Sequence, residues 1–235
     1  MPKRPKSTSP DHGFLEFVQA IVAGDATAAA RMSDTSPVLV RQRAVVGATR
    51  RSVETYFYQP IAHYMYEGDT ALHMAAAGFK HDIAQSLIDR GADCSAKNRR
   101  GAEPLHYAAD SNIWSPVSQA ATIDCLIRAG ADPDASDKSN VRPLHRAVRT
   151  RCAAAVEALL AGGADPRGRN GHGATPLHLA VQNTGRGGSG APHAIEQQRQ
   201  IIALLLKAGA TPDDRDGKGK AVRDAAVAHW IHAQF

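Results

Sequence analysis

Four histidines are the residues of this chain whose spacing most invites a chemical interpretation. They are His73, His106, His145 and His178, and each closes a short motif of the form x-Pro/Ala-Leu-His. Imidazole nitrogens are common zinc ligands, so a metal site is one interpretation. The histidines lie 33 or 39 residues apart, however, with one in each motif. We therefore predict a structural role and no metal site.

A glycine-rich run and an acidic pair are the other candidates for chemistry. Gly185, Gly187 and Gly190 satisfy the pattern G-x-G-x-x-G. A dinucleotide site also requires a preceding strand and a helix that starts directly after the run. A helix is expected before this run, and the chain offers no βαβ unit. Asp213 and Asp214 are interpreted as turn-forming residues on a solvated edge. No catalytic constellation has mechanistic spacing, so we predict a non-enzymatic protein without a cofactor.

Composition indicates close-packed helices. The chain has 235 residues, of which 43% are hydrophobic and only 5% aromatic. A core of Ala, Leu, Ile and Val favours helices over a large β-sandwich. No apolar stretch reaches about 18 residues, and the N-terminus lacks an apolar signal region, so we expect a cytoplasmic protein. Lys3, Arg4 and Lys6 contribute three of the five net positive charges, which makes charge a weak argument for nucleic-acid binding.

A repeat of 33 residues organises the chain. Each histidine motif is followed by a Leu/Ile pair and then by Gly-Ala. The step from that glycine to the next histidine is always 15 residues, and the basic step from histidine to glycine is 18. This pattern strongly resembles the ankyrin repeat, here with inserted loops and an Arg- and Ala-rich composition of bacterial type. The resemblance implies an all-α solenoid of paired antiparallel helices, linked by hairpin-like fingers. It also implies that each motif histidine bonds to the backbone of a neighbouring finger.

The repeat phase divides the chain into a tail, two caps, one separate insertion and four repeats. We expect a disordered basic tail at 1–12, an atypical capping repeat at 13–36 and an aromatic-rich insertion at 37–64. Four repeats follow, at 65–97, 98–136, 137–169 and 170–215, and a capping half-repeat covers 216–235. Two repeats carry insertions of their own, at 111–119 and 183–197. Both should emerge at the end of the solenoid opposite the fingers. There, Trp114 and Arg186 could form one composite surface, or the two loops could simply be tolerated. A small-ligand site at the Gly-rich loop is a further alternative.

The insertion at 37–64 concentrates aromatic residues. Five of the chain's twelve aromatics lie within residues 56–66. The pattern predicts two short strands around a turn, as in an elongated finger, with a helix over 44–58 as the alternative. The rings either shield the joint between the cap and the next repeat or form a partner-binding patch. The candidate patch residues are Tyr56, Tyr58 and Tyr64.

The resemblance implies that a protein partner binds to the finger tips and to the exposed face of the first helices. The positions that correspond are Tyr66, Glu67, Asp69, Arg99, Arg100, Asp110, Lys138, Arg149, His172, Gln182, Lys218 and Lys220. This face begins aromatic and acidic and then becomes basic, which favours an acidic segment of a partner. The alternatives are a charged surface kept for solubility and a nucleic-acid interface. We expect a monomer that binds a protein and neither a membrane nor nucleic acid.

Overall fold

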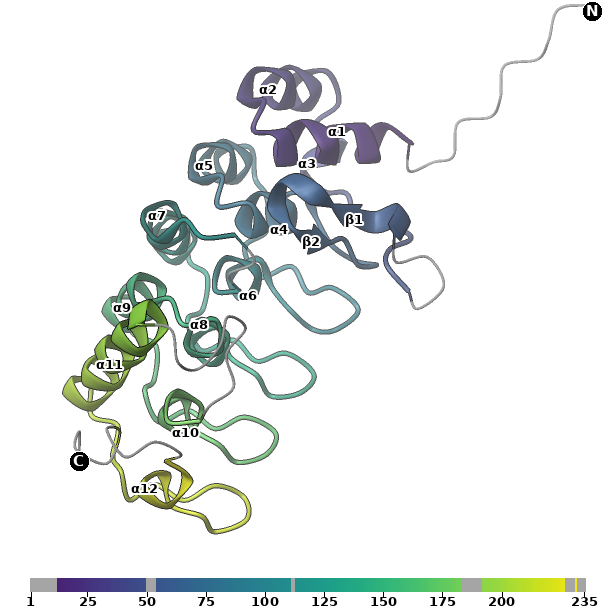
Figure 1. Cartoon of the computed structure of the whole chain (residues 1–235). Coiled ribbons are helices and arrows are strands. Elements are labelled where there is room, and N and C mark those ends of the chain that lie inside the picture. Colours follow the sequence, from purple (N-terminus) through teal and green to yellow (C-terminus); the bar gives the residue numbers. More distant parts are fainter. Residues whose placement is uncertain (1–11, 50–53, 111–112, 183–191, 227–230, 232–235) are drawn as a thin grey trace, which may run out of the picture.

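Paired helices stack side by side into a curved solenoid, and hairpin-like fingers project from one side of it (Figure 1). This computed structural model describes residues 12–49, 54–110, 113–182, 192–226 and 231. Residues 1–11 of the predicted basic tail, the glycine pattern at 185–190 and Arg186 lie outside the described residues, and His12 already belongs to the first helix. The predicted all-α repeat architecture is confirmed.

Two rows of helices form the solenoid. The inner row consists of α1 (His12–Ala23), α4 (Ala71–Ala77), α6 (Pro104–Ala108), α8 (Pro143–Thr150), α10 (Pro176–Ala180) and α12 (Val222–Ala225). The outer row consists of α2 (Ala26–Thr35), α5 (His81–Asp89), α7 (Pro116–Arg128), α9 (Ala153–Ala161) and α11 (Pro192–Lys207). Alanines at one repeated position of the inner row, such as Ala75 and Ala108, are fully buried, and this lets neighbouring inner helices approach closely.

The histidine motif caps each inner helix and ties it to the next finger. The hydroxyl oxygens of Thr70 and Thr175 accept hydrogen bonds from the backbone of the first turn, as N-cap residues do. Each histidine Nδ1 accepts the N–H of the cap residue, so Nε2 carries the proton and donates it to a carbonyl of the following finger. The Nε2–O distances are 3.1 Å for His73–Ala102, 3.0 Å for His106–Val141, 3.1 Å for His145–Ala174 and 3.2 Å for His178–Lys220.

Burial favours the neutral form of His73, His106 and His145. It lowers the pKa of His73 and His145, and it lowers the pKa of His106 to about 4. A ring that both accepts through Nδ1 and donates through Nε2 must be neutral, so the hydrogen bonds agree with the direction of the shift. The motif histidines are therefore structural links between repeats.

The fingers are built by two further sets of bonds. An Asn or Asp lies five residues before the N-cap of each of the inner helices α6, α8, α10 and α12. Its side chain accepts hydrogen bonds from the backbone N–H groups two and four residues further on. These residues are Asn98, Asp137, Asn170 and Asp216. Neighbouring fingers also bond through their backbones, as in Arg99 N–H to the Glu67 carbonyl at 2.9 Å. The sequence analysis did not identify these Asn and Asp residues, although their fixed spacing was visible.

The aromatic insertion forms a short helix and a hairpin. Helix α3 (Val38–Arg41) precedes the antiparallel strands β1 (Phe57–Tyr58) and β2 (His63–Tyr64). Single 3₁₀ turns flank β1, at Glu54–Tyr56 and Gln59–Ile61. The two predicted strands are present, and the described residues of 44–58 contain no α-helix.

The hairpin covers the inner row instead of projecting as a free finger. Ile61 is fully buried and lies against the end of α4, where a Cβ on Gly78 would come within 2.7 Å of it. Figure 1 shows β1 and β2 beside α1 and α4. The physical reason is that the side chains of Ile61, His63 and Met65 are buried, so one side of the hairpin belongs to the core.

The insertions of two repeats meet at one end of the solenoid. The indole of Trp114 contacts the ring of His193 edge-on, with ring centroids 4.9 Å apart. Helices α7 and α11 begin at Pro116 and Pro192, so the last residues of both insertions are helical. Residues 116–119 and 192–197 therefore lengthen the outer helices.

Candidate protein-binding face

The position directly after each motif histidine defines the inner face of the repeats. It is occupied by Met74, Tyr107, Arg146 and Leu179. Met74 and Tyr107 are 0% and 2% exposed, and His63 of the hairpin lies against the Tyr107 ring, whereas the Arg146 side chain is 12% exposed and Leu179 is half-buried. The inner face is therefore closed over α4 and α6 and becomes open from α8 onward.

Asp69 is a predicted partner-binding residue that the structure removes from the surface. Its side chain is fully buried and accepts hydrogen bonds from the Tyr107 hydroxyl at 2.9 Å and from Asn98 Nδ2 at 2.8 Å. The backbone N–H of Tyr66 donates to its other oxygen at 2.6 Å. This carboxylate joins a finger to α6. Burial and the nearby Asp69 charge raise the pKa of Tyr107, so its hydroxyl remains a donor.

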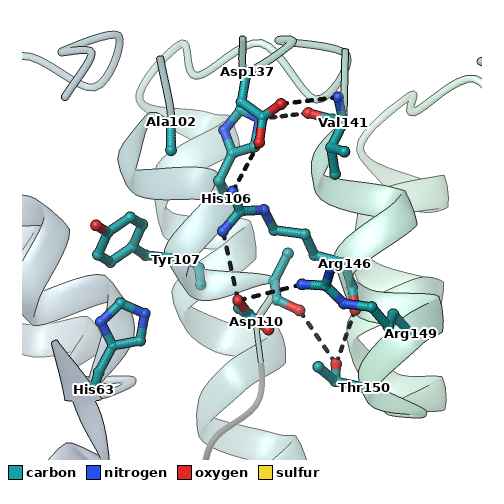
Figure 2. Close-up of polar contacts among 12 residues, drawn as sticks. His63, Ala102, His106, Tyr107, Asp110, Asp137, Val141, Arg146, Arg149 and Thr150 are labelled. Atoms are coloured by element: carbon teal, nitrogen blue, oxygen red, sulfur yellow. Dashed lines mark hydrogen bonds and ion pairs between the residues drawn. The ribbon is translucent and has the colours of Figure 1, made fainter. Parts of the chain in front are cut away.

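Asp110, Arg146 and Arg149 form a network on the open part of the face, with Asp137 of the adjoining finger (Figure 2). Arg146 pairs with Asp137 at 3.0 Å and with Asp110 at 3.5 Å. Arg149 lies 3.7 Å from Asp110, and its side chain is 53% exposed. Two arginines and two aspartates cancel in charge, so the predicted basic character does not extend over this part of the face.

Arg146 is the functional candidate that the sequence analysis missed. It precedes Arg149 by three residues, which places both on one side of α8. Its position directly after a motif histidine was a usable signal. Arg146 is mostly buried and links two elements, whereas Arg149 is half-exposed and available to a partner.

His63 forms the wall between the closed and open parts of the face. Its ring lies beside that of Tyr107, with centroids 4.5 Å apart, and Figure 2 shows both rings next to the Asp110–Arg146 network. Its Nδ1 is 2.7 Å from the carbonyl oxygen of Tyr64. Burial lowers the pKa of His63 despite the nearby carboxylates. An aromatic wall thus adjoins a charged patch.

The finger tips carry the unpaired basic charge. The guanidinium carbons of Arg99 and Arg100 lie 5.5 Å and 5.2 Å from the centre of the Tyr66 ring, within cation–π range. The remaining predicted tip residues are exposed, namely Glu67, Lys138, His172, Lys218 and Lys220. Within the described part of the chain, none of these arginines and lysines has an ion-pair partner. The exposed tips are therefore strongly cationic.

The remaining predicted residues lie at the margins. Gln182 is half-buried beyond the end of α10. Tyr56 and Tyr58 are half-buried and pack against the core, while the ring of Tyr64 lies 4.8 Å from that of Phe57. The tyrosines thus contribute to the joint next to α4, and a partner-binding patch on them stays a prediction.

Other chemical candidates are accounted for by structural contacts. Asp214 is buried and pairs with Arg167 at 2.7 Å, so the expectation of a solvated edge is wrong for this residue. The neighbouring Asp213 is exposed and pairs with Arg223.

Among the described residues, no group of three or more His, Cys, Asp or Glu side chains is arranged to hold a metal ion. No described helix combines the length and apolarity needed to cross a membrane.

Comparison with known families agrees with this architecture. Models described as ankyrin repeats match residues 52–115, 126–180 and 172–217. The chain belongs to the ankyrin-repeat family, as the resemblance predicted. Ankyrin repeats generally mediate protein–protein interaction. Family membership therefore assigns the coarse role of an interaction module.

Similar curated proteins match this chain over part of its length. It is 32% identical over 82 residues to the human protein fem-1 homolog A, which covers 32% of this chain and 12% of that protein. It is 29% identical over 136 residues to a transient receptor potential cation channel subfamily A member 1 homolog of Caenorhabditis elegans, covering 49% and 11%. It is 35% identical over 84 residues to the tyrosine-protein kinase Shark of Drosophila melanogaster, covering 35% and 8%. The chain thus spans about a tenth of the length of these relatives.

Proposed function

We propose that this chain is a non-enzymatic scaffold, adaptor or inhibitor that binds an acidic segment of a protein partner. The binding surface consists of the finger tips and the open inner face from α8 to α10. The observation that carries the proposal is the row of exposed tip cations without ion-pair partners. Those cations border a face on which Arg149 is half-exposed.

Arg99 and Arg100 are the proposed anchors. Their guanidinium groups lie over Tyr66, which restricts their motion before any partner arrives. Restricting a side chain in advance lowers the entropy cost of binding. Guanidinium groups also bind carboxylates with two parallel hydrogen bonds, which ammonium groups cannot do. Lys138 continues the positive charge on the next finger.

The test is capture of a partner from native lysate by the full chain, with nuclease present. The test variant is Arg99→Glu/Arg100→Glu. The matched control is Arg31→Glu/Arg128→Glu, which reverses the same number of charges at exposed positions of α2 and α7. We expect a protein retained by wild type and by the control, and lost by the test variant.

Two results would contradict the proposal. A partner retained equally by the wild type and the test variant would exclude the finger tips as its binding site. A partner recovered only without nuclease would identify a nucleic-acid interface instead. The single variant Arg149→Glu tests the inner face. Arg149 is half-exposed, so this substitution should weaken partner binding without unfolding the repeat.

A further inference from the structure

The outer row of helices contains a groove that is formed by Trp114 and residues of α7, α9 and α11, and by none of the motif residues of the inner row. It lies between α9 and α11, and the N-terminal end of α7 closes it, with a cavity of about 470 Å³. Ala153 and Ala154 of α9 line its floor. Trp114 stands at one end, and Leu204 and Lys207 of α11 lie along one side.

Helix lengths explain why the groove exists. The outer helices α7, α9 and α11 all end two residues before their repeat glycine, and they contain 13, 9 and 16 residues. At 1.5 Å per residue, α7 and α11 therefore extend about 6 Å and 10 Å past the start of α9. Trp114 and His193 meet at this end, and Gln197 Oε1 accepts the Ala153 N–H at 3.0 Å. The walls are thus held by contacts between repeats.

Apolar surface is exposed at the closed end of the groove. Trp114 is 54% exposed, and Val117, in the first turn of α7, is 81% exposed. Exposed large apolar side chains that gather in one region are characteristic of interaction sites. Trp114 lines the cavity and is still more than half exposed, so the cavity is an open surface groove, and this favours a macromolecular partner over an enclosed small ligand.

Two charges lie in the groove and remain available. Glu157 projects from α9 and Lys207 from the last turn of α11, and both line the cavity. Neither has an ion-pair partner among the described residues. A partner that pairs with both must present one basic and one acidic side chain on the same side.

We propose that this groove binds an amphipathic helix of a protein partner. The apolar stripe of that helix packs on Trp114, Ala154 and Leu204, and its basic and acidic side chains pair with Glu157 and Lys207. From Gln197 to Lys207 the wall spans ten residues of α11, or about 15 Å, which matches about three turns of a docked helix. This surface is separate from the finger-tip face, so one chain can hold two partners.

The probe is a phage-displayed library of 12-residue helix-forming peptides, selected on the full chain. Selection uses the wild-type chain alone, and the enriched peptides are then tested on Ala154→Phe, which fills the floor of the groove without removing a core side chain. We expect enriched peptides with an apolar stripe at helical spacing and one charge of each sign. They should bind Ala154→Phe at least tenfold more weakly than wild type.

Charge exchange supplies a second variant that does not depend on filling the groove. Glu157→Lys and Lys207→Glu should each weaken an enriched peptide about tenfold, and the double variant should prefer the peptide with its charges reversed. Arg99→Glu/Arg100→Glu is the control, and it should change the affinity by less than twofold. Selection of no peptide, or peptides that bind all groove variants as tightly as wild type, would overturn the proposal. Circular dichroism verifies that every variant is folded.

Discussion

Tyr107 and Arg146 occupy the same position of two successive repeats and have opposite roles. Both follow a motif histidine on an inner helix. Tyr107 is 2% exposed and bonds to the buried Asp69, whereas Arg146 pairs with Asp110 and Asp137 at the open face. The repeat defines where the side chain points, and the hairpin at residues 57–64 decides whether that place is fully enclosed, as at Tyr107, or keeps the partial exposure of Arg146.

The comparison separates a closed region from an open one. In the closed region, polar side chains are enclosed and depend on one another for hydrogen bonds. In the open region, similar side chains retain access to water. Removing a polar group should therefore cost more stability near Tyr107 than near Arg146. The predictions that follow test this difference, starting with the largest effect.

Asp69→Ala should destabilise the chain most, by about 3 kcal/mol, because it leaves the buried Tyr107 hydroxyl without an acceptor and removes one of the two acceptors of the buried Asn98 amide. Asp110→Ala on the open face should cost about 1 kcal/mol or less. Urea denaturation of both variants measures the difference. Equal losses of unfolding free energy for the two substitutions would contradict the proposed difference between the closed and open regions.

Acidification should destabilise the closed region next. Burial lowers the pKa of His106 to about 4, below the ordinary value of 6.5. The fold therefore favours the neutral ring, and its full stability is present above about pH 6.5 and is lost as the pH falls toward 4. By proton linkage, His106 alone should reduce the free energy of unfolding by about 2 kcal/mol between pH 7 and pH 5.

Urea midpoints at the two pH values test this expectation, and His106→Gln is the informative variant. It removes the titrating ring, so its stability should decrease less between pH 7 and pH 5 than that of wild type. An identical pH dependence in the two proteins would show that protonation of His106 is not linked to unfolding.

Arg146→Ala should have a smaller effect, of about 1–2 kcal/mol, because it leaves the mostly buried Asp137 without its cation and leaves Asp110 with only the more exposed Arg149. Arg149→Ala removes a half-exposed partner of only one of them and should cost about 0.5 kcal/mol or less. Thermal unfolding ranks the two variants. The reverse order would mean that Arg149 is the structural residue and Arg146 the exposed one.

Arg99→Ala/Arg100→Ala should also change stability little, by about 1 kcal/mol or less for the pair, since exposed cation–π contacts are weak. The same variant should nevertheless lose the proposed partner in the capture experiment. A large loss of stability would instead identify the tip arginines as structural residues, with Tyr66 as their anchor.

Much of the fold could be predicted from short stretches of sequence. Helix caps, the 33-residue period and the role of the histidines depend on residues within about one repeat of each other. Thr175, Pro176 and His178 specify the start of a helix wherever they occur. The candidate site could be predicted only as a set of positions, because the repeat pattern says where a side chain points and not what lies above it.

By itself, the sequence determined the repeat architecture and the linking histidines. Only the tertiary structure decided which predicted surface residues are buried and which charges are neutralised. Asp69 meets Tyr107 across 38 residues of chain, and Trp114 meets His193 across a longer stretch that joins two insertions. Capping and periodicity are local interactions encoded within a few residues. Burial depends on which distant segment covers a side chain, and no local pattern records that.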